Sequence, residues 1–288
     1  TRAPTSEFES NLMVGYDSGP GYKARAGISG PISDSVRYRA SVSYFDTDGY
    51  IDNAYLGEEA DPYRDLSARV RLMWDATDHL TTDLRFYTSQ VKTQALYFNI
   101  TEHVDDTSLP VRVNNRGTNE RDMYGASLKF DYTSDVGTFT SITAYDTLEE
   151  ILTGDQFDFL PIEESVLFQF FGADQAQHQY LDIEAVSQEL RFTSPSDNPV
   201  RWIVGAYAIA TDRFISTGNV FDFGTGIVPE VKRQPLPLFN PQFTYLADSQ
   251  DNFAWAVFGD LEIDFSERWE AAFALRYDND ERENTLNQ

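Results

Sequence analysis

The sequence predicts an all-β protein that forms an antiparallel wall of a transmembrane β-barrel, with about 11 strands. Apolar and polar residues alternate with a period of two in segment after segment, as they do in strands with one apolar face. Short turns and long connections follow one another along the chain, which is typical of a barrel with short turns on one side of a membrane. Tyrosine and tryptophan also gather near the ends of the predicted strands.

The first five strands are predicted in the N-terminal third of the chain. In residues 36–44, Val36, Tyr38 and Tyr44 alternate with Arg37 and Arg39. In a soluble sandwich the apolar face of such a strand is buried and the arginines are exposed to solvent. In a membrane barrel the apolar face instead contacts lipid, and the polar face lines a water-filled lumen. The same alternation predicts strands at 8–16, 22–29, 66–74 and 80–86.

Six further strands are predicted in the rest of the chain. Segment 124–132 carries tyrosine, alanine, leucine and phenylalanine on one face, and 139–145 follows it after a short turn. Segment 186–192 has a polar residue, Gln188, within its apolar face, and 200–214 is apolar on both faces at its centre. The last two strands, 253–265 and 269–277, alternate cleanly.

The connections between these strands differ in length in a regular way. Turns rich in Pro, Gly, Asp and Ser lie at 30–35, 75–79, 133–137, 194–199 and 265–268. Between them, long external loops are predicted near 46–63, 91–120, 150–182 and 216–250, and only the first connection on that side, 17–21, is short. Residues 1–288 therefore form one partial β-barrel domain. A soluble sandwich rarely keeps several loops of about 30 residues at one end.

Composition narrows the classes of function. There are 47 acidic and 22 basic residues, a formal net charge of -25, which argues against a nucleic-acid partner. There is no cysteine, so neither disulfides nor thiolate chemistry is available. The longest apolar run, 202–210, is about half of the roughly 20 residues that a membrane-spanning helix needs. Residues 1–8 have no signal-peptide pattern, which predicts a mature chain or a piece of a longer one.

Three strand–turn–strand motifs carry a resemblance to a known family. They are "GPISDSVRYRASVSYFDTDGYIDN", "SQELRFTSPSDNPVRWIVGAYA" and "FAWAVFGDLEIDFSERWEAAFALRYD". In this order they resemble the barrel portion of TonB-dependent receptors of Gram-negative outer membranes, over roughly residues 8–282. The resemblance implies a 22-stranded barrel closed by an N-terminal plug domain, which the TonB protein contacts to deliver energy.

Two departures from the family pattern accompany this resemblance. Neither a plug nor a TonB-contact segment is present before Thr1, and the chain stops at "DERENTLNQ" instead of on a terminal aromatic strand. About 11 strands is half of 22, and an odd number does not close the usual even ring. We therefore expect a fragment, the first half of a barrel wall that lacks the plug and the C-terminal half.

The resemblance implies transport, and it leaves the solute open among ferric siderophores, cobalamin and oligosaccharides. External loops would capture a scarce solute and the plug would gate its passage. The implied partners are outer-membrane lipid and lipopolysaccharide, the plug of the same parent chain, TonB through that plug, and a small solute ligand. The implied location is the Gram-negative outer membrane. A passive porin-like or structural barrel without energy coupling remains an alternative, and a soluble β-sandwich is a more distant one.

Two long loops carry the candidate ligand-binding residues. Loop 150–182 contains seven acidic residues and no Lys or Arg, together with Phe168, Phe170 and Phe171. Such a loop suits a cationic or aromatic ligand, or divalent ions that bridge lipopolysaccharide, although a solvated loop whose phenylalanines pack on their own neighbours is the favoured reading. Loop 91–120 and the residue after it suit an anionic chelate, because guanidinium groups match carboxylates and phosphates; the residues concerned are Tyr97, Phe98, Arg112, Arg116 and Arg121.

Arginines on the polar face of the strands are expected to point into the lumen. They more readily tie the wall to acidic residues of other strands or of the plug than bind a ligand. These lumen-facing residues are Arg25, Arg37, Arg39, Arg69, Arg71, Arg85 and Arg276.

No catalytic, metal or cofactor site is predicted. The stretch "DTDGYIDN" at 46–53 has clustered aspartates, but its glycine comes too early for a calcium loop and Gly57 stands where a glutamate is needed. The three histidines are far apart in sequence and have no metal-ligand spacing. No nucleophile elbow, P-loop or dinucleotide glycine pattern occurs. A barrel enzyme that acts on lipids would need such a site at its rim, so we expect no enzymatic activity.

Overall fold

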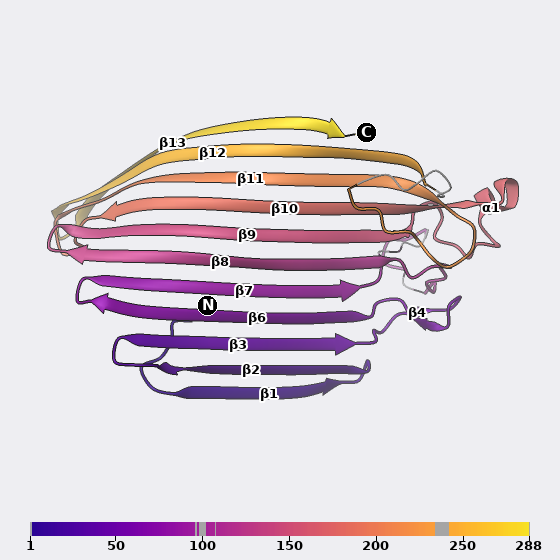
Figure 1. Ribbon diagram of the computed structural model, residues 1–288, viewed down its shortest axis with the longest axis horizontal. Coiled ribbons are helices and arrows are strands. Elements are labelled where there is room, and N and C mark those ends of the chain that lie inside the picture. The colour runs from indigo at the N-terminus through magenta and orange to yellow at the C-terminus, as the bar shows by residue number, and fades with distance from the viewer. Residues whose placement is uncertain (1, 96, 98–101, 107, 234–241, 288) are drawn as a thin grey trace.

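The computed structural model describes residues 2–95, 97, 102–106, 108–233 and 242–287. Eleven of its strands form one sheet in which every neighbouring pair is antiparallel and sequence neighbours are also spatial neighbours (Figure 1). The predicted all-β class and strand number are confirmed. The strands are β1 (Glu9–Asp17), β2 (Gly21–Pro31), β3 (Val36–Thr47), β6 (Tyr63–Thr77), β7 (Leu80–Thr93), β8 (Thr118–Ser134), β9 (Gly137–Asp155), β10 (Asp174–Thr193), β11 (Val200–Asp222), β12 (Gln242–Ser266) and β13 (Trp269–Asn287).

Short turns lie at one end of the sheet and long connections at the other, where the hairpin of β4 (Asp52–Asn53) and β5 (Glu58–Glu59) and the helix α1 (Val166–Phe171) project (Figure 1). The strands reach further into this end than the sequence predicts. Residues 150–155 and 174–182, expected in a loop, belong to β9 and β10, and 216–222 and 242–250 belong to β11 and β12. The alternation fades there because polar side chains occur on both faces, so the sequence pattern ends before the strand does.

The ladder register assigns each residue to one of two faces. Val36 stands opposite Trp74, and Tyr38 opposite Leu72, so apolar side chains share a face. Arg39 stands opposite Arg71, which stands opposite Arg85. All seven arginines expected in the lumen lie on this second, polar face of the sheet. The separation of apolar and polar side chains onto opposite faces is therefore continuous across the sheet.

The apolar belt crosses the strands at a slope. On β2 its middle is near Arg25, which the ladder connects, row by row, to Asn284 on β13. On β13, however, the middle of the apolar run is near Phe273. A shift of about 11 residues over nine strand intervals, at about 3.4 Å per residue and about 4.8 Å between strands, is a slope of about 40°.

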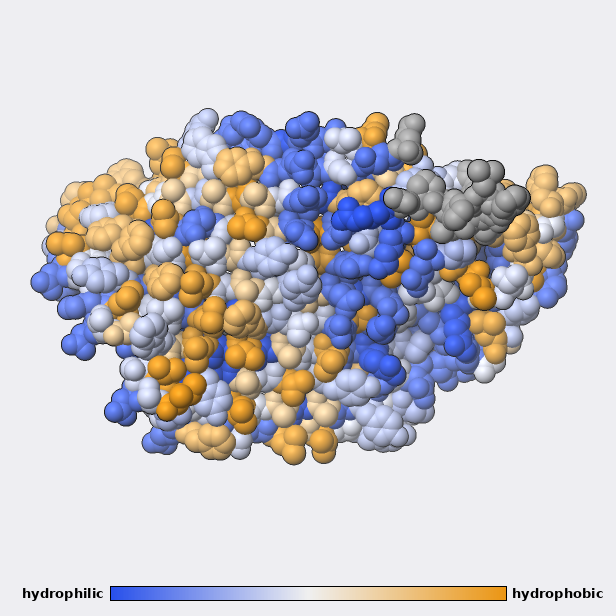
Figure 2. Space-filling view, in the orientation of Figure 1, coloured by the Kyte–Doolittle hydropathy of each residue, from blue (hydrophilic) through white to orange (hydrophobic). Residues whose placement is uncertain are grey.

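This slope matches the strand tilt of transmembrane barrels, about 35–45°. Figure 2 shows the corresponding orange band, which runs diagonally across one face of the molecule. A belt that is level in a membrane must cross tilted strands at this angle. The register and the hydrophobic pattern therefore both fit the geometry of a transmembrane β-barrel wall.

No described element covers the apolar face of the belt. Leu12 on β1 is 77 % exposed and Leu275 on β13 is 80 % exposed. The buried apolar clusters lie instead at the end with the long connections: one around Tyr180 and Phe214, the other around Val111 and Val113. A two-layer soluble sandwich would bury the belt, so the described residues do not form one.

Candidate functional site

The polar face contains a groove of about 1090 Å³ that lies over β1 to β9. Serine, glycine and alanine line much of it, and Arg2, from the stretch before β1, also reaches it. The N-terminal stretch is held on this face, because Thr5 N donates to Ser29 Oγ at 2.9 Å and Arg39 Nε donates to Ala3 O at 3.0 Å. Five of the seven predicted wall arginines line the groove: Arg25, Arg39, Arg69, Arg71 and Arg85.

Asp83 is the centre of a buried ion-pair network on this face. Its carboxylate is only 4 % exposed and accepts two hydrogen bonds from Arg71, at 2.9 and 2.7 Å. Arg85 Nη2 donates to the same carboxylate at 2.6 Å. The network fixes two arginines of adjacent strands, because a bidentate arginine–carboxylate pair has a defined geometry.

The other wall arginines differ in their partners. Arg37 Nη2 is 2.7 Å from Asp75 Oδ2, and Arg276 Nη2 is 2.8 Å from Asp278 Oδ1. Arg39 reaches Glu9 at 3.7 Å. Arg25 and Arg69, by contrast, form no hydrogen bond or ion pair with any residue that the structure describes. Two guanidinium groups on a face of small residues therefore remain available for an acidic partner.

Four long connections pack against one another into a loop cap, made of the described residues of 48–62, 94–117, 156–173 and 223–233. Asn53 Nδ2 donates to Val113 O at 3.0 Å, and Tyr55 Oη donates to Glu163 at 3.0 Å. Ser216 Oγ donates to Lys232 O at 2.6 Å, which holds the fourth connection on β11. The cap is thus built by contacts between segments that are distant in sequence.

The cap separates the residues expected to bind an anionic chelate. Tyr97 packs against the Val111 and Val113 cluster, and burial raises the pKa of its hydroxyl. Arg112 Nη1 pairs with Glu164 at 2.9 Å and Arg116 pairs with Glu58. Phe98 lies outside the described residues.

Arg121 is not a loop residue. It belongs to β8, where its Nε is 3.2 Å from Glu150 Oε2 on β9. The three arginines are therefore each paired with a different glutamate and do not converge. The acidic partners were visible in the sequence, but only the strand register and the loop packing decide which carboxylate each arginine meets.

The short helix α1 carries the phenylalanines of the third long connection. Ser165 caps its N-terminus by accepting from Phe168 N, and Gly172 ends it in the left-handed conformation with φ of 71°. Phe168 is half-buried, whereas Phe170 and Phe171 are each 79 % exposed. Figure 1 places α1 at the far tip of the long-connection end, so these two rings are the most accessible of the predicted loop residues.

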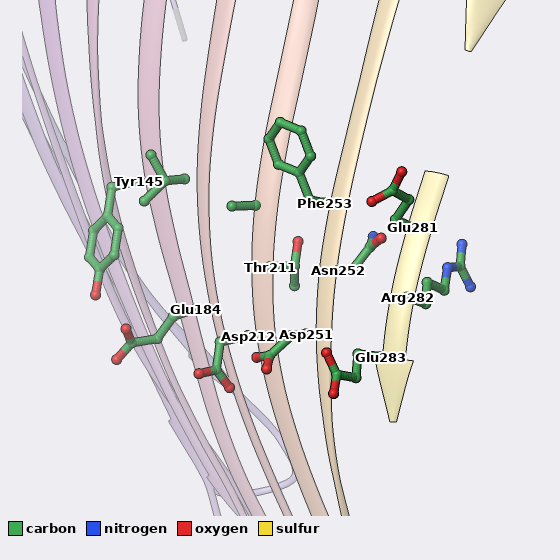
Figure 3. Close-up of a pocket in the computed structure, with 12 residues that line it drawn as sticks. Tyr145, Glu184, Thr211, Asp212, Asp251, Asn252, Phe253, Glu281, Arg282 and Glu283 are labelled. Atoms are coloured by element: carbon green, nitrogen blue, oxygen red, sulfur yellow. The ribbon is translucent and has the colours of Figure 1, made fainter. Parts of the chain in front are cut away.

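A row of carboxylates on the outward face was not predicted from the sequence. Glu184, Asp212, Asp251 and Glu283 stand opposite one another on β10 to β13, on the apolar face just beyond the belt. With Tyr145 and Phe253 they line an open pocket of about 640 Å³ (Figure 3). The signal was the change from apolar to acidic residues at outward-facing positions.

No protein-family model matches the sequence, and no curated protein is significantly similar to it. Solved structures do match. The ferripyoverdine receptor of the Pseudomonas aeruginosa outer membrane is 13 % identical with a TM-score of 0.74, and the match covers 99 % of this chain and 38 % of that one. The ferric yersiniabactin uptake receptor of Yersinia pestis is 15 % identical with a TM-score of 0.70, with 99 % and 45 % covered.

The copper transporter OprC is also similar, at 15 % identity and a TM-score of 0.64, with 98 % of this chain and 39 % of that chain covered. The chain thus spans less than half the length of these two receptors and this transporter. Among the described residues, no helix is long and apolar enough to cross a membrane. The chain has the fold of the barrel portion of TonB-dependent outer-membrane receptors, and its 11-stranded sheet matches part of their 22-stranded barrel.

Proposed function

We propose that the chain is part of the wall of a receptor that takes up a scarce solute through a Gram-negative outer membrane with energy delivered by TonB. The observation that carries the proposal is the tilted apolar belt on a sheet with a polar opposite face. The match of nearly the whole chain to about two-fifths of several receptors supports it. In this arrangement the belt meets lipid, and the acidic row beyond it lies at the level of lipopolysaccharide headgroups.

We further propose that the groove on the polar face receives the plug of the parent chain. Small residues leave room for a folded domain, and the N-terminal stretch already runs along this face. The unpartnered Arg25 and Arg69 supply two positive charges toward it. This feature favours a plugged receptor over a passive porin-like barrel, whose lumen would be filled with water.

The arginines give a direct test of the plug contact. In the full-length protein, reversing both charges with Arg25→Glu and Arg69→Glu should loosen the plug, because like charges would then face its acidic residues. We expect cells carrying this variant to become sensitive to a large hydrophilic antibiotic that the outer membrane normally excludes. Ser41→Glu with Ser67→Glu, on the same face, adds the same number of carboxylates without removing the arginines. Equal sensitivity in both variants would contradict a specific role for Arg25 and Arg69.

Energy coupling is tested by uptake in the native host. A ferric chelate, copper, cobalamin and an oligosaccharide would each be supplied in turn as the limiting solute. A strain lacking this gene should grow poorly on one of them. Disrupting TonB should produce the same defect for the same solute. A defect that appears without this gene but not without TonB would support the passive barrel instead.

The loops are examined in the same assay. Phe170→Ser with Phe171→Ser should lower the uptake rate at limiting solute by about tenfold, since two rings buried against a ligand contribute at least about 1.4 kcal/mol. The amount of receptor in the outer membrane should not change, because both rings are exposed. Unchanged uptake would remove these residues from the capture site.

A further inference from the structure

The loop-cap end of the sheet encloses a cluster of aspartates that no basic side chain of the described residues compensates. Asp155 ends β9, Asp174 begins β10 and Asp222 ends β11, and all three lie on one face, because Asp174 stands opposite Asp222 while Asp155 stands opposite Ala176. Their exposed fractions are 4 %, 2 % and 4 %. Asp158, three residues after Asp155 in the chain, has one carboxylate oxygen that is also buried.

Each of three carboxylates is fixed by the backbone through one oxygen only. Gln156 N donates to Asp155 Oδ1 at 2.7 Å, Leu160 N to Asp158 Oδ1 at 3.1 Å, and Gln175 N to Asp174 Oδ1 at 2.7 Å. The second oxygen, Oδ2, is buried in all three residues and has no hydrogen-bond partner among the described residues. Burying a carboxylate oxygen without a hydrogen-bond partner costs free energy, because the oxygen loses its hydration and nothing replaces it.

Neutral oxygens without partners lie beside these carboxylates. Asn114 is 4 % exposed, and its Nδ2 donates to Asp222 Oδ2 at 2.7 Å while its Oδ1 has no partner. Thr153, which is fully buried, precedes Asp155 by two residues on the same face, and its Oγ1 is also unpartnered within the described chain. These groups are not acidic, so repulsion between carboxylates does not explain why they remain unsatisfied.

The positive charge that would balance the cluster is not supplied by the described residues. None of the four aspartates forms an ion pair with a described lysine or arginine. His178 lies on the same face opposite Thr153 and is fully buried.

We propose that this cluster binds one Ca²⁺ ion, with Asp155 and Asp174 as carboxylate ligands and Asn114 and Thr153 as neighbouring oxygen donors. The unpartnered groups that the proposal uses are all oxygens, which suits a hard cation and not a transition metal. Ca²⁺ accepts six to eight oxygens in an irregular shell, including carbonyls and water, whereas Mg²⁺ demands a tighter octahedron.

The aspartates alone do not complete such a shell. Within the described ranges, no group of three or more His, Cys, Asp or Glu side chains is placed to hold a metal ion, so the site uses two carboxylates and no more. The amide and hydroxyl oxygens, with water, supply the rest of the shell. The ion would join the connection that carries Asn114 to the ends of β9 and β10, independently of which solute the receptor transports.

The test uses the full-length protein, purified in detergent, freed of metal with EDTA and titrated calorimetrically with CaCl₂ and separately with MgCl₂. We expect one Ca²⁺ per chain with Kd of about 10⁻⁴–10⁻³ M or tighter, the range of extracellular calcium sites, and about tenfold weaker Mg²⁺ binding. Asp155→Asn with Asp174→Asn should abolish the Ca²⁺ signal. These substitutions should also raise Tm in EDTA, because they remove uncompensated charge, so loss of binding will not reflect misfolding.

A matched control changes two exposed carboxylates instead. Asp212→Asn with Asp251→Asn removes the same charge from the acidic row on the outer face and should leave Ca²⁺ binding unchanged. Two results would overturn the proposal. One is the absence of a Ca²⁺ titration at millimolar concentration, as expected if a lysine from elsewhere in the parent chain fills the cluster. The other is binding that survives in the Asp155 and Asp174 variant but is lost in the control.

Discussion

Replacing Asp83 by asparagine is expected to lower the free energy of unfolding of the full-length barrel by about 3 kcal/mol. Removing one partner of a buried ion pair leaves the remaining charge unpaired, which costs about 3–5 kcal/mol. We take the lower end, because the Arg85 side chain is 42 % exposed and can turn to water, whereas that of Arg71 is only 13 % exposed. Unfolding by urea in detergent micelles, followed by loss of the compact band in unheated gels, measures the change.

Asp248→Asn is the matched control for this prediction. Asp248 accepts from Arg213 at 3.3 Å on the same polar face, but both side chains are 35 % exposed. A pair with that exposure contributes at most about 1 kcal/mol. Equal destabilisation by the two substitutions would mean that the burial of Asp83 does not matter, and the central role of its network would be wrong.

Placing an arginine in the middle of the apolar belt is expected to be similarly damaging. Leu190 lies on β10 between Val186 and Phe192, on the face that we assign to lipid. Leu190→Arg should destabilise the barrel by about 2–4 kcal/mol, because the charge must enter the hydrocarbon region or distort the bilayer to avoid it. The measurement is the urea midpoint of the full-length protein refolded into lipid vesicles.

Ser187→Arg serves as the control, since Ser187 lies on the polar face of the same strand, opposite Ala144 and Ile209. There the new side chain meets the lumen or the plug, and we expect a change of less than about 1 kcal/mol. If Ser187→Arg were the more damaging substitution, the two faces would be assigned the wrong way round. The membrane orientation of the whole wall would then have to be rejected.

The sequence was sufficient for the wall because its signal is local. A period of two is present in each strand by itself, so the 11 strands and their two faces follow without knowledge of distant contacts. The alternation of Arg37 and Arg39 with Val36 and Tyr38 already separates the faces correctly. Turn residues mark the short connections equally well, because their conformational preferences are local too.

The sequence was insufficient where polar residues occur on both faces. Residues 174–182 are strand, yet His178 and Asp174 interrupt the alternation, so the strand start was placed too late. Outside the belt, a strand no longer has lipid on one side, and loops cover outward-facing positions instead. The hydrophobic alternation therefore does not indicate a strand in such a region.

Only the tertiary structure decided which charged groups meet. Asp155 and Asp174 flank an 18-residue connection, and Asn114 comes from another one, yet the β9–β10–β11 register and the loop cap bring them to one enclosed place. In the same way, Arg112 and Arg116 were predicted to converge on a ligand but pair with Glu164 and Glu58. Strand periodicity is a property of neighbours in the chain, whereas the partner of a charge depends on register and loop packing, which no single segment specifies.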